Sequence, residues 1–168
     1  PPGLAIFAVS ERARERAKQS PDRGYYFDLI EFHDNHVKGM TPSTPCISLF
    51  YGLQQRLLEV EAEGLENRYA RHLRLNERMR AWGLAKGFTL LPEVRFGTRG
   101  LNCFKNDRNA DLERLNKTLK SRHKLVIDGG YGKLKGKTFR ISNMGDETDA
   151  TIATLIAALD DSFAEQGM

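Results

Sequence analysis

GGYGKLKGKTFRISNMG, residues 129–145, is the segment that decides how the second half of this chain folds. Its glycines and its Gly-Lys-Thr run invite a P-loop interpretation, but that motif needs a glycine five positions before Gly136, where Tyr131 stands. A P-loop also leads into a helix, whereas the residues from Thr138 to Ile141 have a strand pattern. We therefore expect a flexible, basic strand connection here rather than a nucleotide site.

The segments on both sides of this loop alternate between strand and helix patterns. We expect strands at residues 88–91, 101–104, 125–127 and 138–141, a helix at 112–119, and a final amphipathic helix through residues 152–163. The order strand, strand, helix, strand, strand, helix is typical of a compact α/β or α+β unit.

The first half opens with a short apolar run. Residues 4–9 read LAIFAV, which predicts a buried strand. Ser10 then has the position of an N-cap for a basic helix that reaches about Lys18. An aromatic-rich stretch at 25–29 and a short polar segment follow, and the polar segment ends at Gly39.

Long helices occupy the middle of the chain. Thr44 as N-cap and Pro45 at the first helical position predict a helix start, and apolar residues recur at helical spacing after it. Gly64 interrupts the pattern, and a second helical stretch runs to about Trp82. We expect two helices, or one helix with a kink.

Composition excludes several classes of protein. The 168 residues are 40% hydrophobic, which is enough for a core and unlike a disordered chain. We find no apolar run long enough to cross a membrane and no signal peptide pattern. The net charge of +4 is compatible with nucleic acid, anionic small substrates or plain solvation.

Cysteine and histidine patterns point to no metal site. Cys46 and Cys103 lie far apart in apolar surroundings, so we expect both to be buried, unpaired thiols of a protein in the reducing cytoplasm. The four histidines, which show no metal-ligand spacing, are His33, His36, His72 and His123.

Arg140 lies inside the apolar strand pattern at 138–141. Burying an arginine is costly unless an anion pairs with it, and its planar fork suits a carboxylate. Substrate binding, a structural ion pair and an outward-facing position all fit the residues alone.

Hydroxyl side chains gather where the first long helix is expected to start. Thr41, Ser43 and Thr44, together with free backbone N–H groups, would suit a phosphate. Simple helix capping explains Thr44 equally well.

Several segments in chain order resemble class V pyridoxal-phosphate (PLP) aminotransferases, the group of serine–pyruvate, alanine–glyoxylate and phosphoserine aminotransferases. They are PPGLA at 1–5, YYFDL at 25–29, TPSTP at 41–45, EGLE at 63–66 with ARH at 70–72, and the glycine-rich segment at 129–145. The resemblance implies a fold type I PLP-transferase, of class α/β. Residues 1–45 would end the large PLP-binding domain, 46–82 would form interdomain helices, and 83–168 would be the small C-terminal domain.

The resemblance also implies roles. The lysine that binds PLP would lie before Pro1, so this chain would hold no catalytic residue and would not transaminate alone. Arg140 would hold the α-carboxylate of an amino acid or 2-oxo acid. Thr41, Ser43 or Thr44 would contact the PLP phosphate of the partner subunit in a homodimer. Some relatives carry a tyrosine and a threonine in this loop, whereas the tyrosine position here is occupied by Met40 or Thr41. The resemblance therefore leaves open which of the three hydroxyls makes the contact.

Two other functions stay open. Another fold type I enzyme, such as a cysteine desulfurase, would need a mobile nucleophilic cysteine, and both cysteines are expected to be buried. A basic module using Lys133, Lys135, Lys137 and Arg140 would bind phosphates or nucleic acid in a salt-sensitive way, with little aromatic support beyond Tyr131 and Phe139.

Overall fold

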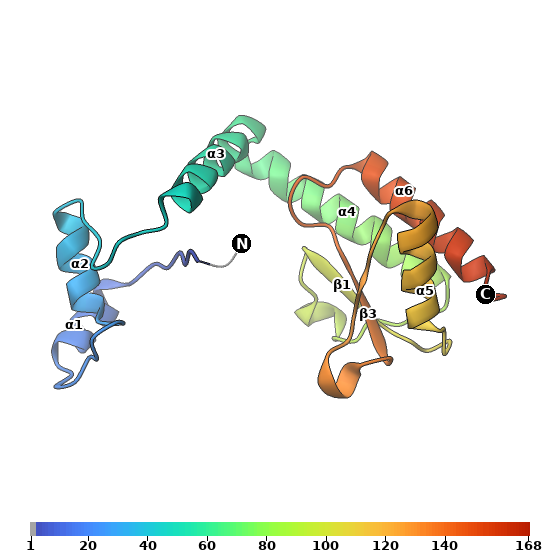
Figure 1. The fold of residues 1–168 in the computed structure, drawn as a ribbon, viewed down its shortest axis with the longest axis horizontal. Coiled ribbons are helices and arrows are strands. Elements are labelled where there is room, and N and C mark those ends of the chain that lie inside the picture. Colours follow the sequence, from blue (N-terminus) through green and yellow to red (C-terminus); the bar gives the residue numbers. More distant parts are fainter. Residues whose placement is uncertain (1–2) are drawn as a thin grey trace. The chain divides into compact units, whose positions relative to one another are not determined.

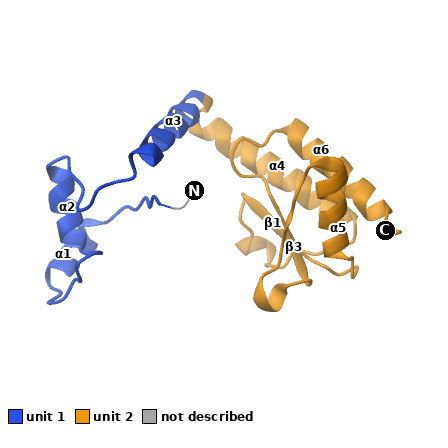
Figure 2. Cartoon of the chain, in the orientation of Figure 1, with its two compact units in different colours: residues 1–62 blue, residues 63–168 orange. Residues whose placement is uncertain are grey.

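The computed structural model describes residues 3–168, so Pro1 and Pro2 of the PPGLA segment lie outside the described residues. The chain forms two compact units, residues 1–62 and residues 63–168 (Figure 2). Each unit is described by itself.

Unit 1 contains helices α1 (Glu11–Lys18), α2 (Leu29–Val37) and most of α3 (Ile47–Glu63) (Figure 1). The predicted cap of α1 is confirmed, because the Ser10 hydroxyl accepts a hydrogen bond from the backbone N–H of Ala13. Phe7 packs edge-on against Phe32 of α2, with ring centroids 5.7 Å apart. These contacts tie the N-terminal segment to the two short helices.

Two expectations for unit 1 are wrong, and one of its helices was not predicted. Residues 4–9 form no strand, because a strand needs a hydrogen-bonding neighbour and the described part of unit 1 supplies none. The polar segment before Gly39 contains α2, which Asp28 caps by accepting a hydrogen bond from the N–H of Ile30. Helix α3 begins at Ile47 and not at Pro45, and the Cys46 carbonyl accepts its first intrahelical bonds.

Unit 2 combines helices with a small antiparallel sheet. After α4 (Leu65–Ala85), its elements are a 3₁₀ turn (Val94–Phe96), β1 (Leu101–Lys105), α5 (Leu112–Thr118), a π-helical turn (Leu119–His123), β2 (Asp128–Gly129), a 3₁₀ turn (Gly132–Leu134), β3 (Thr138–Ser142) and α6 (Asp149–Ala164). The strand order is β1-β3-β2, so β3 is central. Helix α4 contacts β1 and α6, and α5 contacts α6.

Most of the expected elements of unit 2 are confirmed, with two corrections. The break at Gly64 is present, and a φ of 82° explains why glycine stands there. Residues 88–91 contribute only one isolated bridge, Leu90 to Phe104, rather than a strand. The strand expected at 125–127 is displaced to Asp128–Gly129, where it can pair with β3.

The core of unit 2 lies between the sheet and its helices. Phe139 of β3 packs against Phe88 and Phe104, with ring centroids 4.9 Å and 5.4 Å away. Trp82 also joins this cluster, and its indole N–H donates to Asp160 at 2.9 Å. Aromatic pairs of this kind each contribute about 0.5–1.5 kcal/mol beyond their buried area, so they fix β3 firmly against the helices.

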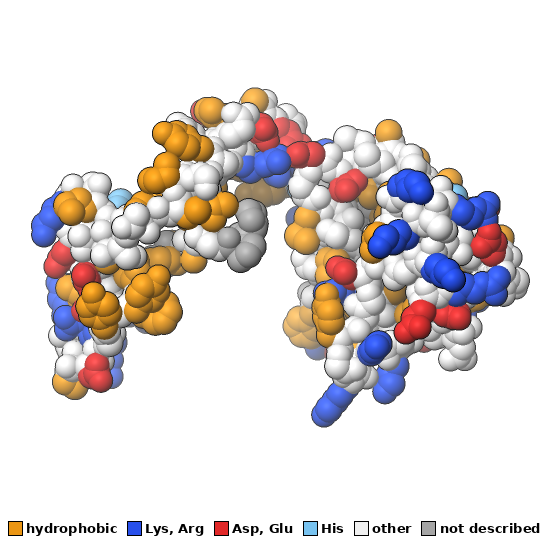
Figure 3. Space-filling model, viewed as in Figure 1, with side chains coloured by type: hydrophobic (Ala, Val, Ile, Leu, Met, Phe, Trp, Pro, Cys, Tyr) orange, Lys and Arg blue, Asp and Glu red, His pale blue; other side chains and the backbone are white. Residues whose placement is uncertain are grey.

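Unit 1 buries far less of its apolar surface than unit 2 does. No residue of α3 counts as buried, and its exposed apolar side chains include Ile47, Phe50, Tyr51, Leu57 and Leu58. Figure 3 shows such side chains gathered over this helix and the rest of unit 1. Within residues 3–168, no helix is both long and apolar enough to cross a membrane.

Candidate functional site

Arg140 occupies the middle of the central strand β3, opposite Cys103 of β1 and Asp128 of β2. Its neighbours Phe139 and Ile141 are buried in the core, so strand alternation turns Arg140 to the other face of the sheet. The side chain is nevertheless only 26% exposed. Sheet geometry thus presents a guanidinium at a sheltered position on an otherwise uncharged stretch of strand.

Two side chains contact the Arg140 guanidinium. Its Nη2 lies 3.3 Å from a carboxylate oxygen of Asp128, and its Cζ lies 4.7 Å from the centre of the Tyr131 ring. Its Nε is buried and has no hydrogen-bond partner among the described residues. The edge of the fork formed by Nε and Nη2 therefore carries one donor with no partner in the described chain.

A hollow of about 540 Å³ adjoins Arg140. Its lining residues are Leu101, Leu125, Val126, Ile127, Asp128, Arg140, Ile141, Ser142, Glu147, Thr151 and Leu155. The walls are mainly aliphatic, and Arg140 is the one cation among them. A small molecule with one carboxylate and a short side chain matches this lining.

Arg140 does not share its surroundings with the lysines of the neighbouring loop. Lys133, Lys135 and Lys137 are exposed, and none of them lines the hollow. The loop that carries them contains a 3₁₀ turn and enters β3 at Thr138, so the P-loop interpretation is excluded as expected.

Thr41, Ser43 and Thr44 lie together in unit 1, on the exposed stretch before α3. The Thr41 hydroxyl donates to the Ser43 carbonyl at 2.7 Å, and within residues 3–168 the structure gives the Ser43 and Thr44 hydroxyls no hydrogen bond. Thr44 was expected to cap the helix, but α3 begins three residues later, so its hydroxyl is not used in that way. Capping therefore does not account for this group of hydroxyls.

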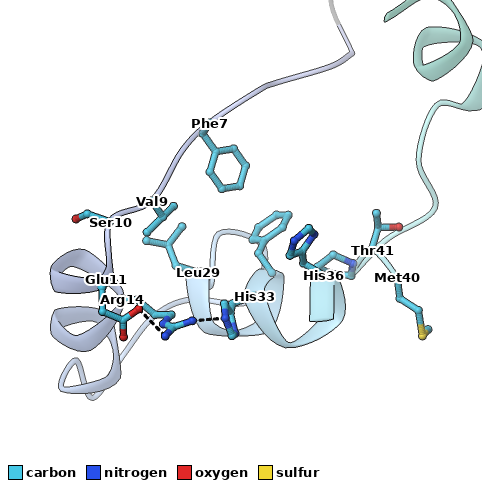
Figure 4. A pocket seen from close by; sticks show the side chains of 12 residues that line it. Phe7, Val9, Ser10, Glu11, Arg14, Leu29, His33, His36, Met40 and Thr41 are labelled. Carbon is cyan, nitrogen blue, oxygen red and sulfur yellow. Dashed lines mark hydrogen bonds and ion pairs between the residues drawn. The ribbon is translucent and has the colours of Figure 1, made fainter. Parts of the chain in front are cut away.

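A second hollow, of about 440 Å³, lies beside this loop within unit 1 (Figure 4). Met40 and Thr41 lie at one end, past the end of α2, and Arg14 lies at the other, in contact with Glu11 and His33. Within residues 3–168, no group of three or more His, Cys, Asp or Glu side chains is placed to hold a metal ion.

The two cysteines differ: the expectation of burial is wrong for Cys46, which is exposed, and Cys103 is half-buried. Cys46 is exposed at the start of α3, and hydrogen bonding from Ser48 lowers the pKa of its thiol. Burial raises the pKa of the Cys103 thiol, although Thr138 and the charge of Arg140 act in the opposite direction. The burial argument against a nucleophilic cysteine therefore fails for Cys46 and holds only in part for the half-buried Cys103.

Comparison with known proteins finds aminotransferases among the relatives of this chain. An uncharacterized aminotransferase of Methanocaldococcus jannaschii is 34% identical over 99% of this chain and 44% of its own length. The small subunit of a soluble hydrogenase from Synechococcus is 32% identical over 99% of this chain and 43% of its own length. The serine–glyoxylate aminotransferase of Methylorubrum extorquens is 31% identical over 100% of this chain and 43% of its own length. The crystal structure of pyridoxamine–pyruvate aminotransferase from Mesorhizobium loti superposes with a TM-score of 0.81 at 25% identity, covering 95% of this chain and 42% of that one.

The homologues of this chain are class V-type aminotransferases, and the chain fits a C-terminal portion of such proteins. It spans less than half the length of the curated relatives it matches. No protein-family model matches the sequence. The α/β fold expected for a PLP-transferase is confirmed by these structural neighbours.

Two motifs of the aminotransferase resemblance have structural roles that the sequence did not reveal. Glu63 accepts hydrogen bonds from Arg71 and Arg68, which lower the pKa of its carboxyl to about 2. Arg71 also donates to the carbonyls of Gly145 and Glu147, so it ties the start of α4 to the loop after β3.

The buried Asn143 also stabilises the loop after β3. Its Nδ2 donates to the carbonyls of His72 and Arg99, and its Oδ1 accepts from the amide of Asn76. His72 in turn contacts the Asn143 carbonyl through Nδ1 at 2.9 Å. These bonds hold the end of the strand that carries Arg140.

Proposed function

We propose that this chain is part of a PLP-dependent aminotransferase that moves an amino group between an amino acid and a 2-oxo acid. The observation that supports it most is Arg140, a sheltered guanidinium with a free buried N–H beside a small aliphatic hollow. Relatives named for serine, aspartate or pyridoxamine donors and for glyoxylate or pyruvate acceptors support the reaction class.

Arg140 would bind the carboxylate that amino acids and 2-oxo acids share. Its guanidinium is planar and permanently charged, so it can hold a carboxylate through two parallel hydrogen bonds. Fixing the carboxylate orients the α-carbon, and such orientation is a large part of what a protein contributes to a cofactor reaction.

The residues before α3 fit the phosphate of PLP. Ser43 and Thr44 carry hydroxyls with no hydrogen bond among the described residues, and Thr41 lies beside them on the exposed stretch that leads to the 17-residue helix α3. Hydroxyl donors near a helix N-terminus are the chemistry that phosphate groups require. PLP, when bound, supplies an electron sink for the α-carbon. Which of Thr41, Ser43 and Thr44 makes the contact is part of the proposal to be tested.

The whole enzyme would be larger than this chain. We propose that residues 1–45 complete a large PLP-binding domain, that 46–82 connect the domains and that 83–168 form the small domain. The PLP-binding lysine would precede Pro1, so the isolated chain would be inactive. The exposed apolar side chains of α3 support a homodimer, and the unpaired cysteines support a cytoplasmic location.

Substitution of Arg140 in the full-length, PLP-loaded protein tests this function. Arg140→Gln keeps a hydrogen-bonding side chain but removes the charge, and we expect kcat/KM for amino acid substrates to fall about 100-fold or more. Arg140→Lys keeps the charge without the fork and should recover part of the loss.

Arg95 offers a matched control. It also pairs with a carboxylate, Glu93 at 2.9 Å, and stacks on an aromatic ring, Phe96 at 4.5 Å, but it is largely exposed. Arg95→Gln should leave kcat/KM unchanged. Equal losses in the Arg140 and Arg95 variants, or no amino transfer by the wild-type protein, would refute the proposal.

A further inference from the structure

The positive charge of Arg140 is already partly matched within the chain. Asp128 stands directly opposite it on the neighbouring strand and places a carboxylate oxygen 3.3 Å from Nη2. Glu147, the other charged residue that lines the adjoining hollow, is also an acid. A ligand in this hollow would therefore meet one cation and two carboxylates.

We propose that Asp128 is a specificity-determining residue, which limits the Arg140 site to substrates with a single negative charge. This inference rests on the proposed function, because it takes Arg140 as the group that binds the substrate carboxylate. Small amino and 2-oxo acids with neutral side chains would be accepted. Dicarboxylic and phosphorylated substrates would be disfavoured, since their second anionic group would lie near Asp128 and Glu147 with no cation to meet it.

The geometry around the guanidinium supports this role. Asp128 contacts Nη2, the nitrogen that both two-donor edges of the guanidinium share, and the buried Nε has no partner among the described residues. A carboxylate held by two N–H groups must therefore take Nη2 from Asp128. The Tyr131 ring covers one face of the guanidinium, so the remaining N–H groups are reached along the plane of the fork. The Arg140 site therefore has room for one carboxylate but lacks donors for a second.

The exposure of Asp128 explains why it would discriminate without blocking the site. Its side chain is 69% exposed, against 26% for Arg140, so it can rotate aside at little cost when a substrate carboxylate arrives. Its negative charge stays close by and repels a further anion. The effect should be moderate in size and should weaken as salt screens it.

The lysines of the neighbouring loop do not offset this charge. Lys133, Lys135 and Lys137 could have favoured a doubly charged substrate had they surrounded Arg140. All three are exposed and none lines the hollow. The charged side chains that line the hollow beside Arg140 are therefore acidic, although the chain as a whole carries a net charge of +4.

Acceptor selectivity of the full-length, PLP-loaded enzyme tests the inference. Pyruvate and 2-oxoglutarate share the reacting 2-oxo acid group and differ in the second carboxylate. The wild-type enzyme should have the higher kcat/KM for pyruvate. Asp128→Asn should shift the ratio of the two values toward 2-oxoglutarate by about fivefold at low salt, mainly through KM, and by less at high salt.

Two further variants separate charge from structure. Asp128→Glu keeps the charge and should keep the wild-type ratio. Glu77→Gln removes an exposed acid of α4 and should leave the ratio unchanged. A wild-type preference for 2-oxoglutarate, or an unchanged ratio in Asp128→Asn, would overturn the role of Asp128 while transamination itself stands. Failure to use either acceptor with any amino donor would overturn the proposed function instead.

Discussion

Replacing Gly130 by alanine should distort the loop that covers Arg140, whereas the same change at Gly129 should not. A Cβ atom at Gly130 would lie 2.2 Å from the Leu134 carbonyl oxygen and 2.5 Å from the Thr138 hydroxyl. At Gly129 it would meet nothing within 4 Å. The two glycines are adjacent in sequence, so each serves as the control for the other.

The size of the effect follows from the crowding. The Cβ would have to move about 1 Å from the Leu134 carbonyl, which is backbone and is held by the N–H of Lys137 at 3.0 Å. Overpacking of this kind costs about 1–3 kcal/mol, and we expect about 2 kcal/mol for Gly130→Ala. Gly129→Ala should change the free energy of unfolding by less than about 0.5 kcal/mol.

Urea unfolding of this chain, followed by tryptophan fluorescence, measures the difference. Trp82 is the one tryptophan in the sequence and lies in the core of unit 2, so it reports on the unit that contains both glycines. With an m value of about 1.5 kcal/mol/M, the urea midpoint of Gly130→Ala should fall by roughly 1.3 M. Equal midpoints for the two variants would refute the argument that close backbone approach requires Gly130.

Two further substitutions test the contacts that hold the end of β3. Asn143→Ala removes a fully buried amide and leaves its partners unsatisfied, among them Asn76, so it should lower the free energy of unfolding by about 3 kcal/mol in urea titrations; a loss under about 1 kcal/mol would contradict this role. Hydrogen bonds from Arg71 and Arg68 lower the pKa of Glu63 to about 2 from 4.5, so its ionised form stabilises the fold above about pH 4.5 and that stabilisation is lost as pH falls toward 2. The difference in urea midpoint between wild type and Glu63→Gln should therefore shrink from pH 5 to pH 2, and a constant difference would show that the charge is not the cause.

Local signals predicted much of the secondary structure. The Ser10 cap, the break at Gly64, strand β3 and helix α6 depend on residues near one another in the chain, and the structure has all four. Helix α2 also had a local signal, the cap at Asp28, which the polar character of the segment obscured.

Features that depend on distant partners were not predictable in the same way. The apolar run at residues 4–9 has the composition of a strand but no neighbour to pair with in the described part of unit 1. Strand β2 is only two residues long because it pairs with just the part of β3 at Phe139 and Arg140. The sequence therefore indicated which segments could be extended, and pairing decided which became strands.

The candidate site was also predictable only in those features that depend on local sequence. Position in a strand pattern pointed to Arg140, and the family resemblance gave it a role. Its contacts with Asp128 and Tyr131 depend on how β2 and the following loop fold back along β3. Cys46 was misjudged because apolar sequence neighbours do not guarantee burial where a segment lies on an exposed loop.

The most direct test of the central claim compares alanine with ethylamine, which is alanine without its carboxylate, as amino donors to the full-length, PLP-loaded protein. If Arg140 binds the substrate carboxylate, the wild-type protein should react with alanine far faster than with ethylamine. Arg140→Gln should bring the alanine rate down toward the ethylamine rate and leave the ethylamine rate unchanged. An equal loss with both amines would show that Arg140 supports the fold rather than the substrate, and no reaction of the wild-type protein with any amino acid would contradict the account as a whole.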